Sequence, residues 1–173
     1  MHRPDRTEYG EYYERYVSLV PDGDIVAQLR EQFTVTTRLL TTVPQEREEW
    51  AYGEGKWSFR EVVGHLADAE RVFADRALWM ARDPSPPLPG MDQEIWAANS
   101  NARTRPLHEL LDEWTAVREA TIALVRSFDA DALSRTGTAS GMRFTVRSFA
   151  WIIAGHELHH RNILTERYGL HQP

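Results

Sequence analysis

Residues 58–82, SFREVVGHLADAERVFADRALWMAR, carry the clearest structural signal in this sequence. Ser58 and Glu61 have the spacing of a capping box, in which each side chain accepts a hydrogen bond from the other residue's backbone N–H. Behind it, inward-facing positions recur every three or four residues, the period of a helix with one buried face. That face comprises Val62, His65, Leu66, Ala69, Phe73, Ala77 and Met80. Pro84 disfavours helical geometry in the residue before it, so a helix is predicted from Ser58 to about Arg82.

Three further segments show the same period, at about 24–42, 106–128 and 145–168. Turn residues 21–24 precede the first, and Pro106 suits the first turn of the second. Thr145 is a plausible N-cap of the third, and Gly169 stands where a left-handed C-cap residue belongs. Residues 91–98 are predicted to form a short helix, Ser85–Gly90 a proline-rich loop, and 129–143 a turn-rich connection. No convincing strand alternation is found.

These segments predict an all-α fold, a four-helix bundle, forming one domain over residues 1–173. The bundle proper would occupy about 24–169. An N-terminal arm of about 1–23 would pack across it through tyrosines spaced for one helical face: Tyr9, Tyr12, Tyr13 and Tyr16. The connections at 43–57 and 83–105 are longer than bundles usually need, and we expect them to shape a site.

Composition narrows the possible functions. The net charge of −6 argues against nucleic-acid partners, because neutralising phosphates needs clustered cations. No apolar run is long enough for a membrane span. The N-terminus does not lead into an apolar signal core, so we expect a cytoplasmic protein. The chain has no cysteine, so a bound metal would need imidazole or carboxylate ligands, which suit Zn, Ni, Fe or Mn.

The histidines point to such a metal. His156 and His160 are one helical turn apart on one face, and they continue the inward stripe of the last helix. Two neutral imidazoles in a core would be poorly satisfied polar groups, a cost that a bound cation removes. His65 lies on the inward face of the helix at 58–82 and supplies a third ligand. Three ligands leave a coordination position open, as in catalytic sites.

Several other polar residues are weaker candidates. Asp68, one turn from His65, could orient a ligand or accept a proton, or it could pair with Arg71 on the surface. Arg76 and Asp92 are possible pocket residues. His159 faces about 60° away from the stripe, as a neighbour of the site or a dimer contact. Glu157 could act as a base, although the spacing favours a solvated position on the outer face.

Residues 156–160 also match the zinc-protease motif H-E-x-x-H. That motif needs a third ligand downstream, and the extended form would place glycine and histidine where this chain has Ile163 and Glu166. Zinc proteases also need a substrate-aligning strand. A protease is therefore not expected.

The sequence resembles the DinB/YfiT-like superfamily of bacterial metal-binding four-helix bundles. Three passages carry the resemblance: residues 57–68, WSFREVVGHLAD; residues 89–93, PGMDQ; and residues 151–160, WIIAGHELHH. The resemblance extends over about 12–169. It implies an up-down-down-up helix order, a metal (usually Ni or Zn) on His65, His156 and His160, and a homodimer. Relatives include bacillithiol- or mycothiol-using S-transferases, a mycothiol-dependent maleylpyruvate isomerase and proteins described as metal-dependent hydrolases.

Three functions are compatible with these residues. The first is an enzyme whose metal activates a low-molecular-weight thiol cosubstrate or water for attack on a small-molecule substrate, as in thiol S-transferases. The second is a metal-dependent hydrolase that uses water alone. The third is a non-catalytic protein whose metal only stabilises the bundle, marked by a fourth protein ligand and no accessible pocket.

Overall fold

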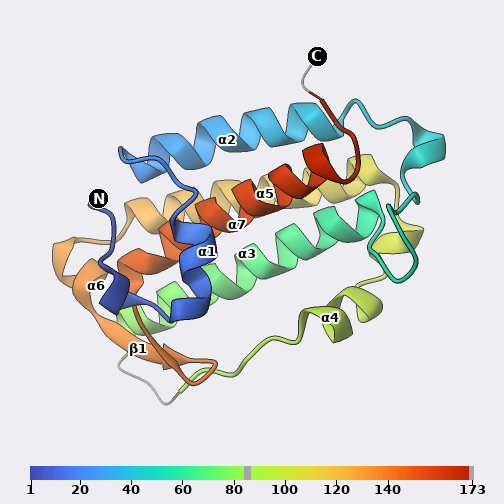
Figure 1. Ribbon diagram of the computed structural model, residues 1–173. Coiled ribbons are helices and arrows are strands. Elements are labelled where there is room, and N and C mark those ends of the chain that lie inside the picture. The colour runs from blue at the N-terminus through green and yellow to red at the C-terminus, as the bar shows by residue number, and fades with distance from the viewer. Residues whose placement is uncertain (84–86, 172–173) are drawn as a thin grey trace.

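The computed structural model describes residues 1–83 and 87–171. Its four long helices are α2 (Ile25–Leu40), α3 (Phe59–Arg82), α5 (Leu107–Arg126) and α7 (Val146–Glu166). Figure 1 shows α2 and α7 running in one direction and α3 and α5 in the other. This is the up-down-down-up four-helix bundle that was expected.

The helix order explains the long connection after α3. Because α3 and α5 are consecutive and parallel, the chain must return along the whole bundle between them (Figure 1). The return segment contains α4 (Gln93–Asn99) and a 3-10 helix at Ala102–Thr104, and both lie against α3. The predicted helix at 91–98 is thus confirmed. Helix α3 ends at Arg82, where its end was predicted. Pro84 and part of the predicted proline-rich loop, residues 84–86, lie outside the described residues.

The predicted helix boundaries rest on local hydrogen bonds. The Ser58 backbone N–H donates to Glu61 Oε2 at 2.8 Å, and the Glu61 N–H donates to Ser58 Oγ at 3.3 Å, which confirms the capping box. Asp24 caps α2 by accepting the Val26 N–H at 3.0 Å. Gly169 has a φ of +71°, the left-handed conformation predicted for it beyond the end of α7.

Helix α7 is the central element of the bundle. It packs against α2 and α3, and also against the N-terminal helix α1 (Glu14–Val17). Every residue from Ser148 to Leu158 is buried. A helix enclosed in this way carries buried side chains on all sides, not on a single stripe.

The N-terminal arm packs across the bundle as expected, but not as one helix. Two 3-10 turns, Arg6–Glu8 and Glu11–Tyr13, lead into α1. Its contact with α7 is close: a Cβ built on Gly155 would lie 2.1 Å from the Tyr16 carbonyl oxygen. Only a glycine at 155 permits this approach of the two backbones.

The prediction that the chain has no strands is wrong. After the short helix α6 (Ala130–Ser134), strands β1 (Thr136–Ala139) and β2 (Met142–Thr145) form an antiparallel hairpin. Its two-residue turn, Ser140–Gly141, has positive φ at both positions (51° and 74°), as a type I′ turn requires. Leu88 pairs with β1 through hydrogen bonds to Thr138 and Ser140, which ties the return segment to the hairpin.

The connection between α2 and α3 contains a 3-10 turn at Gln45–Arg47. Over the described ranges, no helix combines the length and apolar character that crossing a bilayer requires.

Candidate metal centre

His65 on α3 and His156 and His160 on α7 converge at the centre of the bundle. One ring nitrogen from each lies within 4.8 Å of the others. His65 Nε2 and His156 Nε2 are 3.1 Å apart. The predicted i,i+4 pair therefore meets the third histidine, 91 residues from His156 in the sequence.

Burial keeps these imidazoles neutral. His65 and His156 are each 5% exposed, and His160 is partly exposed. Burial lowers the pKa of His65 to about 4. Burial also lowers the pKa of His156 and of His160 well below the usual range, and the neighbouring histidines lower both further. A neutral imidazole presents the lone pair that a metal ligand needs.

Aromatic side chains hold the three rings in place. The Trp57 ring packs 4.6 Å from His65 and nearly parallel to His160 at 6.5 Å. Tyr16 and Phe73 both contact the His156 ring edge to face, with centroids 5.2 and 5.8 Å away. These contacts limit ring rotation and surround the nitrogens with apolar surface.

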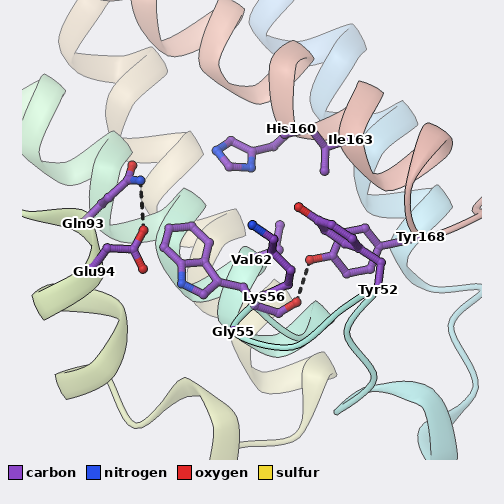
Figure 2. Close-up of a pocket in the computed structure, with 10 residues that line it drawn as sticks. Tyr52, Gly55, Lys56, Val62, Gln93, Glu94, His160, Ile163 and Tyr168 are labelled. Carbon is purple, nitrogen blue, oxygen red and sulfur yellow. Dashed lines mark hydrogen bonds between the residues drawn. The ribbon is translucent and has the colours of Figure 1, made fainter.

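Two cavities reach the histidines from different sides. The first, of about 180 Å³, opens at His160 (Figure 2) and is lined by Tyr52, Lys56, Trp57, Gln93, Glu94 and Tyr168 among others. The second, of about 80 Å³, reaches both His65 and His156. Its wall comes from the N-terminal arm, α3, the return segment and the hairpin turn. Gln93 lines both cavities, so the long connection shapes the surroundings of the histidines.

The weaker candidates have different positions. Asp68 Oδ1 accepts a hydrogen bond from Arg71 at 3.3 Å, and Asp68 is not part of the histidine cluster. Burial raises the pKa of Asp68, against the opposing effect of Arg71. Asp92 caps α4 by accepting the N–H groups of Glu94 and Ile95. Arg76 lines the second cavity.

His159 is partly exposed, beside the ligand cluster. Its ring contacts Tyr16 and His160, each with centroids 5.3 Å apart. Burial lowers the pKa of His159, and Arg15 lowers it further. This arrangement favours a role as a neighbour of the site.

The prediction that Glu157 is solvated is wrong. This carboxylate is 1% exposed and accepts hydrogen bonds from Arg118, Gln32 and Thr36 at 2.6–2.7 Å. The apolar run at residues 149–154 could have indicated that Glu157 is buried. A helix with buried side chains on all sides leaves no solvent-exposed face for the residues that follow. Glu157 belongs to a buried polar network and does not reach the cavities.

The network continues through Arg118 to α3. Arg118 donates to both carboxylate oxygens of Glu70, at 2.8 and 2.9 Å, and to the Leu29 carbonyl. Trp114 Nε1 also donates to Glu70. Burial would lower the pKa of Arg118, but Glu157 and Glu70 outweigh it and raise the pKa. Sequence spacing gave no indication of these contacts between α3, α5 and α7.

The histidine cluster fits a divalent transition metal. In a tetrahedral site with Zn–N bonds of about 2.0–2.1 Å, two ligand nitrogens lie roughly 3.3 Å apart, close to the separation of His65 and His156. Apart from that contact, the three rings form no hydrogen bond with another described side chain or backbone group. A cluster of neutral nitrogens that contact only one another is what an ion would satisfy.

Comparisons with known proteins agree with this fold. The model of the DinB superfamily matches residues 28–164. A protein of Oceanobacillus iheyensis, provisionally named a metal-dependent hydrolase, is 28% identical over 141 residues, covering 79% of this chain and 81% of the relative. A similarly named protein of Geobacillus thermodenitrificans is 28% identical over 99 residues, 56% of each chain.

Two solved structures share the architecture. YfiT from Bacillus subtilis, described as a probable metal-dependent hydrolase with an unusual four-helix bundle topology, superposes with a TM-score of 0.75 at 18% identity, covering 98% of this chain and 95% of that one. A mycothiol-dependent maleylpyruvate isomerase superposes with a TM-score of 0.69 at 16% identity, covering 84% of this chain and 61% of that one. At these identities the similarity establishes the fold.

Proposed function

Since the chain belongs to the DinB superfamily, we propose that it is a metal-dependent enzyme whose ion is held by His65, His156 and His160 and activates a nucleophile. One observation carries the proposal: three neutral ring nitrogens from α3 and α7 meet where two cavities reach them. A divalent ion held there would supply a Lewis acid that lowers the pKa of a bound water or thiol.

The chain's own residues prepare the site for that role. Burial keeps the imidazoles unprotonated, so their lone pairs remain available at neutral pH. Trp57, Phe73 and Tyr16 pack against the imidazoles and limit their rotation. The cavity at His160 leaves one side accessible to a small molecule.

The ligand count supports a catalytic role over a purely structural one. A structural ion is normally closed off by four protein ligands, whereas three leave a position for water or substrate. Within the described part of the chain, the cluster contains three histidines and no fourth ligand. One cavity reaches His160 and the other reaches His65 and His156, which favours an enzyme over a protein whose metal only stabilises the bundle.

We propose water as the first nucleophile to test, because the named relatives from Oceanobacillus iheyensis and Geobacillus thermodenitrificans are described as metal-dependent hydrolases. A second candidate is transfer to a low-molecular-weight thiol. Two separate cavities at one centre suit a reaction with two substrates. The fold is also that of a mycothiol-dependent isomerase, and a chain without cysteine needs an external thiol for sulfur chemistry.

We propose Zn or Ni as the ion, because either suits three imidazole ligands. Asp68 is proposed as a proton acceptor, which its substitution tests. A homodimer and a cytoplasmic location are proposed on the family resemblance and on the sequence. The mass of the protein in solution, measured by light scattering, tests the dimer.

Elemental analysis tests the metal centre. We expect about one ion per chain in the untagged parent, and loss of that ion in His65→Ala and His156→Ala. His108→Ala is the matched control, because His108 is exposed on α5, away from the cluster. A parent without metal after supply of Zn or Ni would contradict the proposal.

Activity measurements then separate the two nucleophiles. The metal-loaded parent would be assayed on activated esters and on carbon electrophiles, each with and without added thiol. Turnover of esters without thiol supports the hydrolase. Turnover that requires thiol supports the transferase, and no turnover of either class by the metal-loaded protein counts against an enzyme.

A further inference from the structure

Arg76 is a buried cation without a counter-ion among the residues that the structure describes. It is 4% exposed, and no carboxylate of the described chain lies within ion-pair distance of it. Arg118, the other buried arginine, is held by two carboxylates. Burying an unpaired charge is costly, so an arginine in this state calls for a ligand that supplies the missing charge.

The structural contacts of Arg76 use only part of its guanidinium. Nη2 donates to the Pro89 carbonyl at 2.8 Å and to Ser140 Oγ at 3.0 Å, which joins the return segment to the hairpin turn. Among the described residues, the N–H groups on Nε and Nη1 donate to no carbonyl or carboxylate oxygen, although the Tyr13 hydroxyl is a further hydrogen-bond partner of the guanidinium. A planar guanidinium with a free edge is suited to a carboxylate, which accepts two parallel hydrogen bonds.

The cavity beside the free edge is lined by a positive side chain and by no negative one. It is the second cavity, lined by Arg76 together with His65 and His156. None of its lining residues is acidic. Arg76 is therefore the only permanently charged side chain on its wall, and an ion on the histidines would add to the positive charge there.

Tyrosine hydroxyls add neutral donors to the same wall. Tyr12 and Tyr16 line the cavity, with their hydroxyl oxygens 3.3 Å apart. Burial raises the pKa of Tyr13, although the charge of Arg76 and a hydrogen bond with it oppose this effect. Protonated phenols donate hydrogen bonds and do not repel an anion.

Phe73 fixes how far Arg76 lies from the histidines. Its ring is 5.9 Å from the Arg76 guanidinium carbon and 5.8 Å from the His156 ring. The guanidinium is therefore within about 12 Å of the imidazole. One small molecule can span this distance.

We infer that the second cavity is a subsite for a carboxylate, and that the substrate of the proposed metal centre carries this group a few bonds from the atom that reacts. Arg76 binds the carboxylate through its free edge, and Tyr12 and Tyr16 contribute hydroxyl donors. The inference rests on the proposed function, because it assumes an ion on the three histidines. Arg76 acts here in binding and orientation.

The test compares two hydroxamates of equal length on the zinc-loaded protein by calorimetry. Both carry the same metal-binding head, and one ends in a methyl group while the other ends in a carboxylate. A series of chain lengths would be measured. At the best length we expect the carboxylate compound to bind the parent about tenfold to a hundredfold more tightly, the range for hydrogen bonds to charged groups.

Substitutions locate the preference. Arg76→Gln should abolish it without weakening the methyl-terminated compound, and Arg76→Lys should retain part of it. Arg126→Gln is the matched control: it makes the same change in net charge at an exposed arginine on α5, outside both cavities. If Arg76→Gln does not fold, the parent still tests the subsite. Its affinity for the carboxylate compound is then compared with its affinity for the methyl ester of that compound.

The outcomes separate the two proposals. Equal binding of both hydroxamates at every length would overturn the carboxylate subsite and leave the open metal position intact. A preference that survives in Arg76→Gln would also overturn it. If neither hydroxamate binds the zinc-loaded parent, the open coordination position is wrong, and the subsite falls with it.

Discussion

Arg118 on α5 and Glu157 on α7 form a fully buried ion pair, with Arg118 Nη1 2.7 Å from Glu157 Oε2. The pair lies directly beside a proposed metal ligand, because Glu157 follows His156. Arg118 also pairs with Glu70 of α3 and donates to the Leu29 carbonyl of α2, so one guanidinium connects all four long helices. The orientation of the ligand-bearing helices therefore depends on a charge network as well as on apolar packing.

Replacing Arg118 with leucine should destabilise the protein by about 3–5 kcal/mol, because Glu70 and Glu157 would be left buried without their cation. Urea unfolding at neutral pH measures the loss. The triple variant that also carries Glu70→Gln and Glu157→Gln should recover part of it, since the uncompensated charges are removed. A loss below about 1 kcal/mol in Arg118→Leu would show that the network is not stabilising.

Glu8 should make stability depend on pH. Burial would raise its pKa, but hydrogen bonds from Arg147, the Asp5 N–H and Thr145 together lower it. A carboxyl group with a lowered pKa in the folded state stabilises the protein above its unfolded pKa of about 4.3, and the contribution disappears as the pH falls through the folded value.

Glu8→Gln should therefore cost about 1 kcal/mol at pH 7 and much less near pH 3. Chemical denaturation at the two pH values measures both figures. Glu11→Gln, at an exposed position in the same arm, is the control and should have little effect at either. Equal losses for Glu8→Gln at both pH values would contradict the assignment.

Gly155→Ala should displace α1 from α7, because the new methyl group would overlap the Tyr16 backbone. Overpacking of this kind costs about 1–3 kcal/mol, and Tyr16 would move away from the His156 ring. Thermal unfolding and metal content are the measurements. Gly53→Ala, where a Cβ has its nearest neighbour at 3.6 Å, is the control. Unchanged stability in Gly155→Ala would mean that the helices approach less closely.

Bound metal should stabilise the fold. At a free zinc concentration one hundred times the dissociation constant, the gain is about 2.7 kcal/mol, and a chelator should reverse it. His160→Ala should lose most of this gain, whereas His108→Ala should keep it. A shift in the melting temperature that is equal in both variants would place the metal elsewhere.

Local signals predicted the helices well. The Ser58–Glu61 capping box and the three- to four-residue period of α3 are properties of adjacent residues, and the structure confirms both. The β1–β2 hairpin was missed because each strand has only four residues, too few for alternation to stand out. Its clue was the Ser140–Gly141 pair, a favourable two-residue hairpin turn.

The candidate site was predicted only in part. The grouping of His65, His156 and His160 could be anticipated because inward-facing positions on a bundle converge. The buried position of Glu157 could not be deduced from the spacing of the histidines, because it depends on Arg118, which lies 39 residues away in the sequence. The free edge of Arg76 likewise depends on how the return segment and the hairpin meet.

The split of the three proposed ligands between α3 and α7 has a consequence for biosynthesis. While the ribosome is still making residues 66–155, the emerging chain offers one of the three histidines, and α7, the helix that fills the middle of the bundle, is missing. A complete set of ligands exists only after that helix has left the exit tunnel and docked. Acquisition of the ion would therefore be a late event in maturation, and a cell short of metal would accumulate folded but unloaded protein.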